Sequence, residues 1–194
     1  MADYIQHTLT KAEKEARRAE RLRQQELERQ TKIAALPDQV HGIPVVEVSY
    51  TAVDKKHVKE MRHEFTGMRR AFLKELAATQ TDALKQMGFS DNMIGLLAKG
   101  ESPKGFNVHH KMPLAGGGKN EFSNFILIKN DPYHTDIHKV SDLQIAKMNA
   151  GETKIVKIPM PQGSVFIPPE KQQSQTAVKT PVSMALLQKM QKAR

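Results

Sequence analysis

The sequence predicts an α+β fold in which a small strand–turn–strand–helix core follows a mostly helical N-terminal scaffold. Residues 9–79 contain two long stretches of helix-forming residues, one of them with an apolar stripe at helical spacing. Residues 105–139 instead contain two short β-forming runs, separated by a glycine-rich turn and followed by a proline that can start a helix. The expected segments are a charged helix that could serve as a delivery or partner arm (1–37), a helical scaffold (38–104), the core with flanking strands (105–168) and a flexible tail (169–194).

The first helix is expected over residues 9–36, which contain no glycine or proline and are dense in Ala, Glu, Arg, Gln and Lys. Thr10 and Glu13 fit a capping box at its start, and Pro37 ends it. Its apolar residues are sparse and its charges alternate in sign, which is typical of a solvent-exposed helix. The alternative is an arm that binds a partner.

The scaffold is expected to contain three further helices. The first covers residues 52–79, where apolar residues recur at spacings of three and four. The second covers 82–87 and stops at Gly88, and the third covers 92–99 and stops at Gly100. His57 and His63 lie among lysines and arginines of the first of these helices, which indicates surface positions.

The residues after the core are expected to be less regular. A short amphipathic helix is predicted over 140–149, and residues 153–158 and 164–167 are predicted to form a hairpin or a pair of edge strands. Residues 168–181 are polar and indicate a flexible linker. Residues 183–194 could form a small basic amphipathic helix.

The composition and net charge limit the classes of function that the chain can have. The 194-residue chain has a net charge of +9, which favours polyanionic partners such as nucleic acid; a soluble basic protein without such a partner is the alternative. It contains no cysteine, so a disulfide framework and a thiolate metal site are excluded. No apolar run is long enough for a membrane span, and no secretory signal peptide is visible at the start.

Four of the eight histidines lie within residues 105–139. His134 and His138 are four positions apart, so on a helix both imidazoles lie on one face. His109 and His110 are neighbours in an expected strand, where side chains point to opposite faces, so only one of them can meet the same metal ion. The glycines at 116–118 provide the turn to the second strand, which contains the apolar run FILI.

This segment resembles the HNH nuclease motif, whose fold is the ββα-metal or His-Me finger hairpin plus helix. It is most similar to the DNase colicins, the S-type pyocins and the nuclease domains of polymorphic bacterial toxins, such as type VI secretion effectors. His109 and His134 are 25 positions apart, as expected for the bacteriocin motif. The matching residues are His109, His110, Pro113, the glycines from Gly116, Asn124, His134 and His138.

The resemblance implies a role for each residue. His109, His134 and His138 would hold one divalent metal ion, with Zn, Ni, Mg and Mn as the candidates. His110 would be the general base that activates water for attack on a phosphodiester. Asn124 would brace the hairpin and orient His110 through a hydrogen bond.

The sequence departs from the bacteriocin pattern at two points. Asn107 stands where the bacteriocins have a glutamate, two positions before the histidine pair. Their phosphate-binding arginine has no clear counterpart either. The local candidates for contact with DNA are Lys111, Lys119 and Lys139, and an ordinary surface lysine is the alternative for each.

The function expected from this resemblance is hydrolysis of DNA phosphodiester bonds by a secreted antibacterial toxin. Such a protein would be cytoplasmic in its producer, protected there by an acidic immunity protein, and exported without a Sec signal into the cytoplasm of a target bacterium. Its N-terminal helix could contact a secretion-system component. The alternatives are a housekeeping, phage or restriction-type HNH endonuclease and a non-catalytic zinc-stabilised nucleic-acid-binding protein. Three protein ligands with an open position favour catalysis over a structural site, but the motif does not distinguish DNA from RNA.

Overall fold

The computed structural model describes residues 9–146 and 148–176. The chain divides into two compact units, Met1–Pro37 and Asp38–Arg194, and each is described by itself. Together they contain both helices and small antiparallel sheets, so the expected α+β class is confirmed. No helix within the described residues is both long and apolar enough to span a bilayer.

The first unit contains one helix, α1 (Lys11–Ala34), as the sequence predicts. The capping box is present: the Thr10 side chain accepts from the Glu13 backbone N–H, and the Glu13 carboxylate accepts from the Thr10 N–H at 2.7 Å. None of the side chains of α1 is buried. The helix is therefore held by local interactions, with little contribution from a hydrophobic core.

The second unit contains two antiparallel sheets. One has the order β1 (Gln39–Val40), β2 (Ile43–Thr51), β5 (Thr153–Pro159), and the other pairs β3 (Phe106–His110) with β4 (Phe125–Lys129). Of the two arrangements predicted for residues 153–158 and 164–167, the hairpin is wrong, because β5 pairs along its length with β2 and forms the edge strand of that sheet. The later segment instead makes one parallel bridge, between Val165 and Leu127.

Three helices form the expected scaffold: α2 (Lys55–Thr79), α3 (Thr81–Met87) and α4 (Asp91–Ala98). Asp54 caps α2, Ser90 caps α4, and Gly88 ends α3 with a φ of 99°. Their apolar stripes pack against one face of the β3–β4 hairpin. The main members of this core are Phe72, Leu73, Leu76, Leu84, Leu97, Val108, Phe125 and Leu127.

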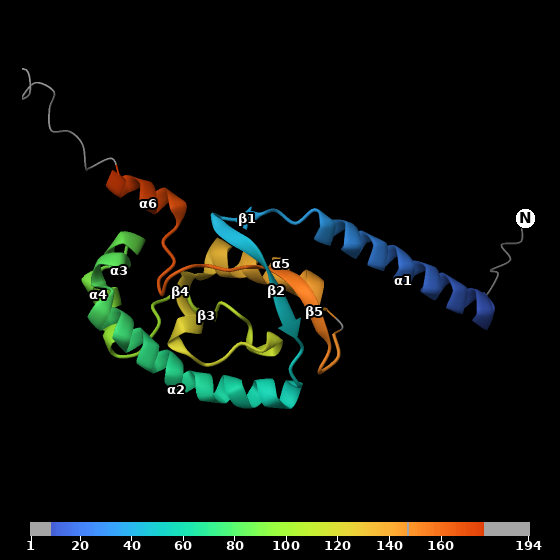
Figure 1. Ribbon diagram of the computed structural model, residues 1–194, viewed down its shortest axis with the longest axis horizontal. Helices are drawn as coiled ribbons and strands as arrows, with labels where there is room; N and C mark the ends of the chain where they lie inside the picture. The colour runs from blue at the N-terminus through green and yellow to red at the C-terminus, as the bar shows by residue number, and fades with distance from the viewer. Residues whose placement is uncertain (1–8, 147, 177–194) are drawn as a thin grey trace, which may run out of the picture. The chain divides into compact units, whose positions relative to one another are not determined.

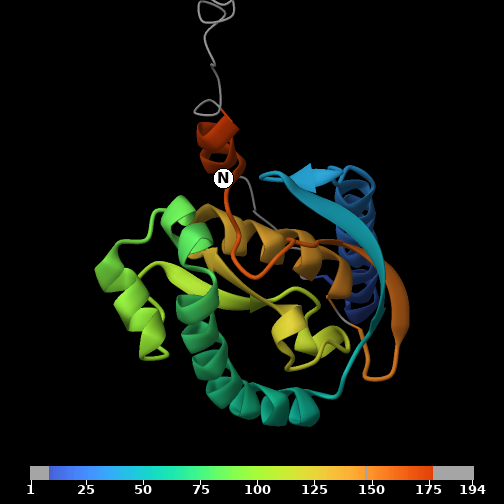
Figure 2. The same cartoon turned by 60° about the vertical axis from the view of Figure 1, so that its left-hand side comes forward.

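A kinked turn, η3 (Asn130–His134), leads from β4 into α5 (Thr135–Ile145), which packs against the opposite face of the hairpin. In both views the hairpin lies between α2 and α5 (Figure 1, Figure 2). Ile126 and Ile128 contact the α5 side, which includes Ile137. Because β4 is covered on both faces, its sequence FILI is apolar without alternation.

The elements after the hairpin are predicted less accurately from the sequence. The helix expected over 140–149 is the second half of α5, which ends at Ile145. Residues 169–176 form a helix, α6 (Pro169–Thr176), instead of part of a flexible linker. Glu170 accepts a hydrogen bond from the Tyr133 hydroxyl at 2.7 Å, and Lys171 donates to the Met87 carbonyl, so this segment is tied to the second unit. The basic helix expected over 183–194 lies outside the described residues.

Candidate metal centre

The β3–β4 hairpin turns its two neighbouring histidines in opposite directions. His109 stands opposite Ile126, whose side chain belongs to the core beneath α5. His110 stands opposite Phe125, on the α2 side, and its ring lies 4.3 Å from the ring of Phe65. The alternation of a β-strand therefore separates the surroundings of the two side chains, as the sequence predicts.

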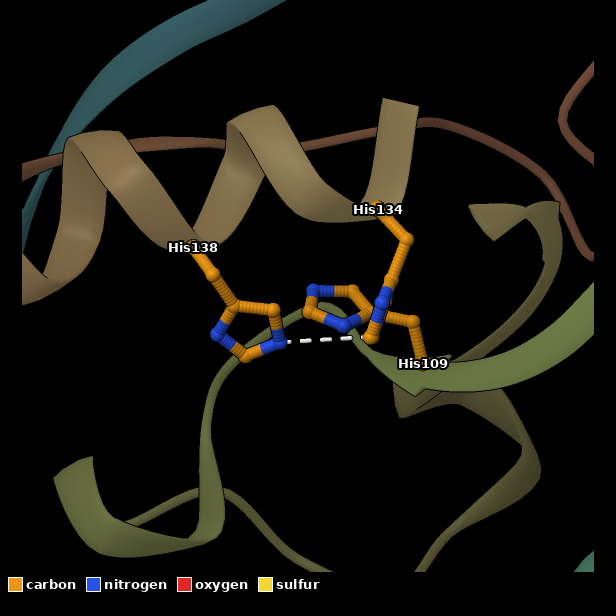
Figure 3. A group of neighbouring side chains, drawn as sticks. All are labelled: His109, His134 and His138. Atoms are coloured by element: carbon orange, nitrogen blue, oxygen red, sulfur yellow. Dashed lines mark hydrogen bonds between the residues drawn. The ribbon is translucent and has the colours of Figure 1, made fainter. Parts of the chain in front are cut away.

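His109 meets His134 and His138 below α5. Its ring centroid is 4.9 Å from that of His134 and 5.2 Å from that of His138. Figure 3 shows the two helical histidines descending from one face of the helix toward the ring from β3, and the dashed line joins their Nε2 atoms at 3.2 Å. One nitrogen from each of the three residues lies within 4.8 Å of the others, so together they can hold a metal ion.

The burial of His109 supports this assignment. Only 5% of the residue is exposed, and its Nε2 atom is buried without a hydrogen-bond partner among the described residues. Burial, together with the nearby His134 and His138, lowers its pKa to about 3. Burial also lowers the pKa of His134, and the charge of a protonated His138 lowers it further. Both rings are therefore neutral at pH 7, and a neutral imidazole is the form that binds metals.

The spacing also fits a metal ion. Zn–N bonds of about 2.05 Å in tetrahedral geometry place the ligand nitrogens about 3.3 Å apart. The pair His134–His138, at 3.2 Å, already has this separation. A buried polar atom without a partner costs about 1–3 kcal/mol, and a bound ion would remove that cost for His109 Nε2. The donor set of three imidazoles leaves coordination positions open for water or substrate.

His110 is held by Asn120, a residue that the sequence analysis did not single out. Its Nε2 atom lies 3.0 Å from Asn120 Oδ1, and Asn120 Nδ2 donates to the Met61 carbonyl of α2 at 2.8 Å. Since the amide NH₂ is used on Met61, the atom that faces His110 is an acceptor. His110 Nε2 must then carry the proton, and its Nδ1 atom is left with a lone pair.

The charge state of His110 also suits a base. Burial lowers its pKa, the hydrogen bond with Asn120 opposes this shift, and the positive charge of Arg62 lowers it further. The neutral imidazole is therefore favoured below the ordinary histidine pKa of 6.5.

Asn124 braces the hairpin loop, but the hydrogen bond expected between Asn124 and His110 is not made. Its side chain accepts from the Met112 N–H at 2.8 Å and donates to the carbonyls of Met112 and Lys119 at 3.0 and 2.9 Å. All of the amide's hydrogen bonds thus go to the loop backbone, which leaves Asn120 to orient His110.

The glycine run allows this loop to close tightly. A Cβ atom on Gly118 would lie 1.9 Å from the Met112 carbonyl oxygen, and one on Gly116 would lie 2.3 Å from the ring of Tyr50. Gly117 has a φ of 95°, in the left-handed region. Gly116 and Gly118 therefore leave no room for a side chain, and Gly117 adopts a backbone conformation that other residues rarely adopt.

The three histidines that could hold a metal ion share one pocket of about 320 Å³ with His110. Arg62 and Phe65 of α2 also line it, although the sequence analysis missed both. No local signal marks these two, because they reach the pocket through the packing of α2 on the hairpin. The remaining lining residues are Val108, Pro113, Leu114 and Ala115.

The three lysines expected to contact DNA do not line this pocket. Lys111 donates to the Ser123 carbonyl at 2.9 Å, and burial lowers its pKa. Lys119 is exposed and pairs with Glu121 at 3.8 Å. Lys139 pairs with Asp136 at 2.7 Å, and the Asp136 carboxylate also accepts a hydrogen bond from His41 Nε2. Each of these lysines therefore makes a hydrogen bond or an ion pair with a nearby residue.

Comparison with known proteins finds a relative whose name describes no function. The chain is 35% identical over 128 residues to a protein from Escherichia coli K12 that is called uncharacterized protein YhhZ. The matched region covers 66% of this chain and 32% of the relative, so the chain spans about a third of the relative's length. No family model matches the chain. No solved structure matches it either.

Proposed function

We propose that this chain is a metal-dependent endonuclease of the HNH type that hydrolyses phosphodiester bonds in DNA. The proposal rests mainly on the observation that two neighbouring histidines, His109 and His110, lie in different arrangements. His109 joins His134 and His138 in a three-nitrogen site, while His110 shares the same pocket but is held separately by Asn120. A purely structural zinc site would use four protein ligands, whereas here the fourth histidine points away from the other three.

The order of elements supports the same proposal. The β3–β4 hairpin supplies one ligand, and the turn and helix that follow supply two, which is the arrangement expected of a ββα-metal core. The donor set of three imidazoles favours Zn, Ni or Co by affinity, whereas Mg is the abundant ion in cells and Mn is a further candidate.

The pocket supports general-base catalysis by His110. When bound by the three histidines, a divalent ion supplies positive charge that stabilises the phosphate oxygens and the leaving 3′ oxygen. His110 Nδ1 accepts a proton from the attacking water while the water oxygen bonds to phosphorus. The bond between phosphorus and the 3′ oxygen then breaks, and that oxygen takes a proton from solvent to leave a 3′-hydroxyl beside a 5′-phosphate. Before this transfer Asn120 Oδ1 holds the neutral His110 ring in its Nε2–H tautomer, and afterwards it accepts from the same Nε2–H of the imidazolium.

Plasmid cleavage tests this activity. The purified chain should convert supercoiled DNA to nicked and linear forms with an added divalent ion, and EDTA should stop the reaction. His110→Ala should lower the rate by about 10²- to 10⁴-fold, since a general base contributes an effect of that size. His63→Ala is the matched control, because His63 is an exposed histidine of α2 outside the pocket. Cleavage that persists in EDTA, or that is equal in both variants, would contradict the proposal.

We further propose that the nuclease acts as an antibacterial toxin, kept harmless in its producer by an acidic immunity protein. The net charge of +9 suits both DNA and an acidic inhibitor. α1, with no buried side chain, is available to contact a secretion-system component during delivery into the cytoplasm of a target bacterium.

Growth of a bacterial host tests the toxin proposal. Cells that express the chain alone should stop growing, whereas cells that express His110→Ala, or the chain together with the product of its neighbouring gene, should grow. Equal growth of all three strains, at confirmed expression, would leave a housekeeping or phage endonuclease as the better assignment.

A further inference from the structure

Three basic residues form a row on the exposed side of α2. Lys55, Lys59 and Arg62 are spaced by four and three positions, so they lie along one face of the helix. All three are exposed, and none is in an ion pair among the residues that the structure describes. Thr66 and Arg69 continue the same spacing toward the middle of the helix.

This row borders the packed face of α2 on the side of the pocket. Each residue of an α-helix is turned by about 100° from the one before it. Lys59 and Arg62 directly follow the buried Val58 and the half-buried Met61, so they lie at one edge of the packed face. Arg62 itself lines the histidine pocket, which identifies this edge as the one that leads into it.

The opposite edge of the same helix is acidic. Glu60 and Glu64 precede Met61 and Phe65 in the sequence, so they border the packed face on its other side. His57 shares that edge and pairs with Glu60 at 3.5 Å. The two glutamates of this half-helix are thus separated from Lys55, Lys59 and Arg62, and only the edge with these three basic residues adjoins the pocket. A polyanion that enters the pocket is attracted along one edge and repelled from the other.

We propose that Lys55, Lys59 and Arg62 form the surface along which the sugar–phosphate backbone of DNA runs into the histidine pocket. This inference rests on the proposed nuclease function, since it takes the pocket as the place of cleavage. The dimensions fit: seven residues of helix advance about 10.5 Å, and one strand of DNA carries a charge about every 3.4 Å along its axis. Arg62 contacts the phosphate nearest the pocket, and the two lysines contact phosphates farther along the strand.

The test compares two charge-matched double variants of the full chain. Lys55→Gln with Lys59→Gln removes two charges from the row. Lys74→Gln with Lys99→Gln removes two charges from exposed lysines that do not line the pocket. Binding of a short fluorescein-labelled DNA duplex is followed by fluorescence anisotropy over a series of KCl concentrations. EDTA is present so that no DNA is cleaved, and the readout is therefore independent of activity.

The row variant should bind DNA about tenfold more weakly than the unmodified chain at moderate salt, and the slope of log K against log salt should fall by about 1.8, or 0.9 for each lost phosphate contact. The control should change affinity by less than about twofold, because its lysines touch no phosphate. Equal weakening of both variants would show that only bulk charge matters and would overturn the inference. Loss of affinity for polyglutamate without loss for the duplex would also overturn it and would assign the row to an acidic protein.

The result separates this inference from the proposed nuclease function. If the row variant loses DNA affinity but the unmodified chain fails to cut plasmid with any divalent ion, the DNA surface stands and the catalytic proposal falls. If the chain cuts plasmid but both variants bind DNA like the unmodified chain, cleavage stands and the DNA surface falls.

Discussion

His109 and His110 are neighbours in the chain, yet their surroundings give them different chemistry. His109 is buried beside two other histidines, and its Nε2 atom has no hydrogen-bond partner in the part of the chain that the structure describes. His110 is half-buried between an asparagine and two phenylalanine rings. A metal ligand needs neighbouring donors, and a general base needs a fixed ring with a free lone pair. The alternation of one strand gives His109 the surroundings of the first and His110 those of the second, which is the division of roles that we propose.

Asn120 is predicted to act on the rate of cleavage through His110. Asn120→Ala removes the acceptor that fixes the ring, so cleavage at saturating metal should fall by about 10- to 100-fold, as expected for a small loss of positioning. Metal affinity should be unchanged, because Asn120 touches none of the three metal-site histidines. The control is Asn92→Ala, which changes an exposed asparagine of α4 and should leave both quantities unchanged. A loss of metal affinity equal to the loss of rate would refute this positioning role.

The pH dependence of cleavage should report the pKa of His110. Its base form must be neutral, so cleavage is present above that pKa and is lost as the pH falls through it. Burial and Arg62 lower the pKa below 6.5, and the loss should therefore occur at a pH below 6.5. Arg62→Gln removes a positive charge that disfavours protonation of His110, so it should raise the pH at which cleavage is lost. Arg62→Lys keeps the charge and should shift that pH less.

Cleavage rates measured between about pH 5 and pH 8, the range over which histidine titrates, check this prediction. Metal must be shown to be saturating at each pH, because protons compete with metal for the three histidines. An unchanged profile, or a move to lower pH in Arg62→Gln, would contradict the assignment of His110 as the base.

At the scale of elements, the loop between β3 and β4 depends on close backbone contact. Gly118→Ala places a methyl group against the Met112 carbonyl, so the free energy of unfolding should fall by about 1–3 kcal/mol, the usual cost of overpacking. Cleavage should fall as well, since the same carbonyl accepts a hydrogen bond from Asn124.

The matched control for the Gly118→Ala variant is Gly95→Ala in α4, where nothing lies within 4 Å of the new methyl group. This variant should raise the free energy of unfolding by about 0.5–1 kcal/mol, because alanine favours a helix more than glycine does. Urea denaturation measures both changes. A Gly118→Ala protein as stable as the unmodified chain would show that the loop is not tightly packed.

The elements also show which parts of the fold the sequence could predict. The apolar stripe of α2 and the caps of α1 and α4 are local patterns, so these helices were predicted within a few residues. The partner of β5 could not be predicted, since its alternation is the same whichever strand it meets, and that strand, β2, lies about a hundred residues earlier. The metal-site histidines follow from spacing within one segment. Arg62 does not, because it reaches the pocket only when α2 packs on the hairpin. Asn120 lies within the same segment, but its role depends on its hydrogen bond to Met61 of α2, which spacing along the chain does not reveal.

At the scale of the whole molecule, the first unit should be dispensable for cleavage in vitro. α1 buries none of its side chains, and all the pocket residues lie after residue 37. A chain that starts at Asp38 should therefore keep the thermal midpoint and the plasmid-cleavage rate of the full chain. In the host-growth test with export-dependent killing, the same truncation should lose activity if α1 serves delivery. A truncated chain that folds but does not cleave would contradict this division.

The cleavage rate of His110→Ala, measured at a metal concentration that calorimetry shows to be saturating, tests the central claim most directly. The division of roles predicts near-complete loss of cleavage while the metal affinity stays close to that of the unmodified chain, because His110 acts on water and not on the ion. His138→Ala is the comparison and should lose metal affinity, since its ring belongs to the three-histidine site. If His110→Ala loses metal as severely as His138→Ala, or cleaves as fast as the unmodified chain, the proposed division between metal ligands and base is wrong.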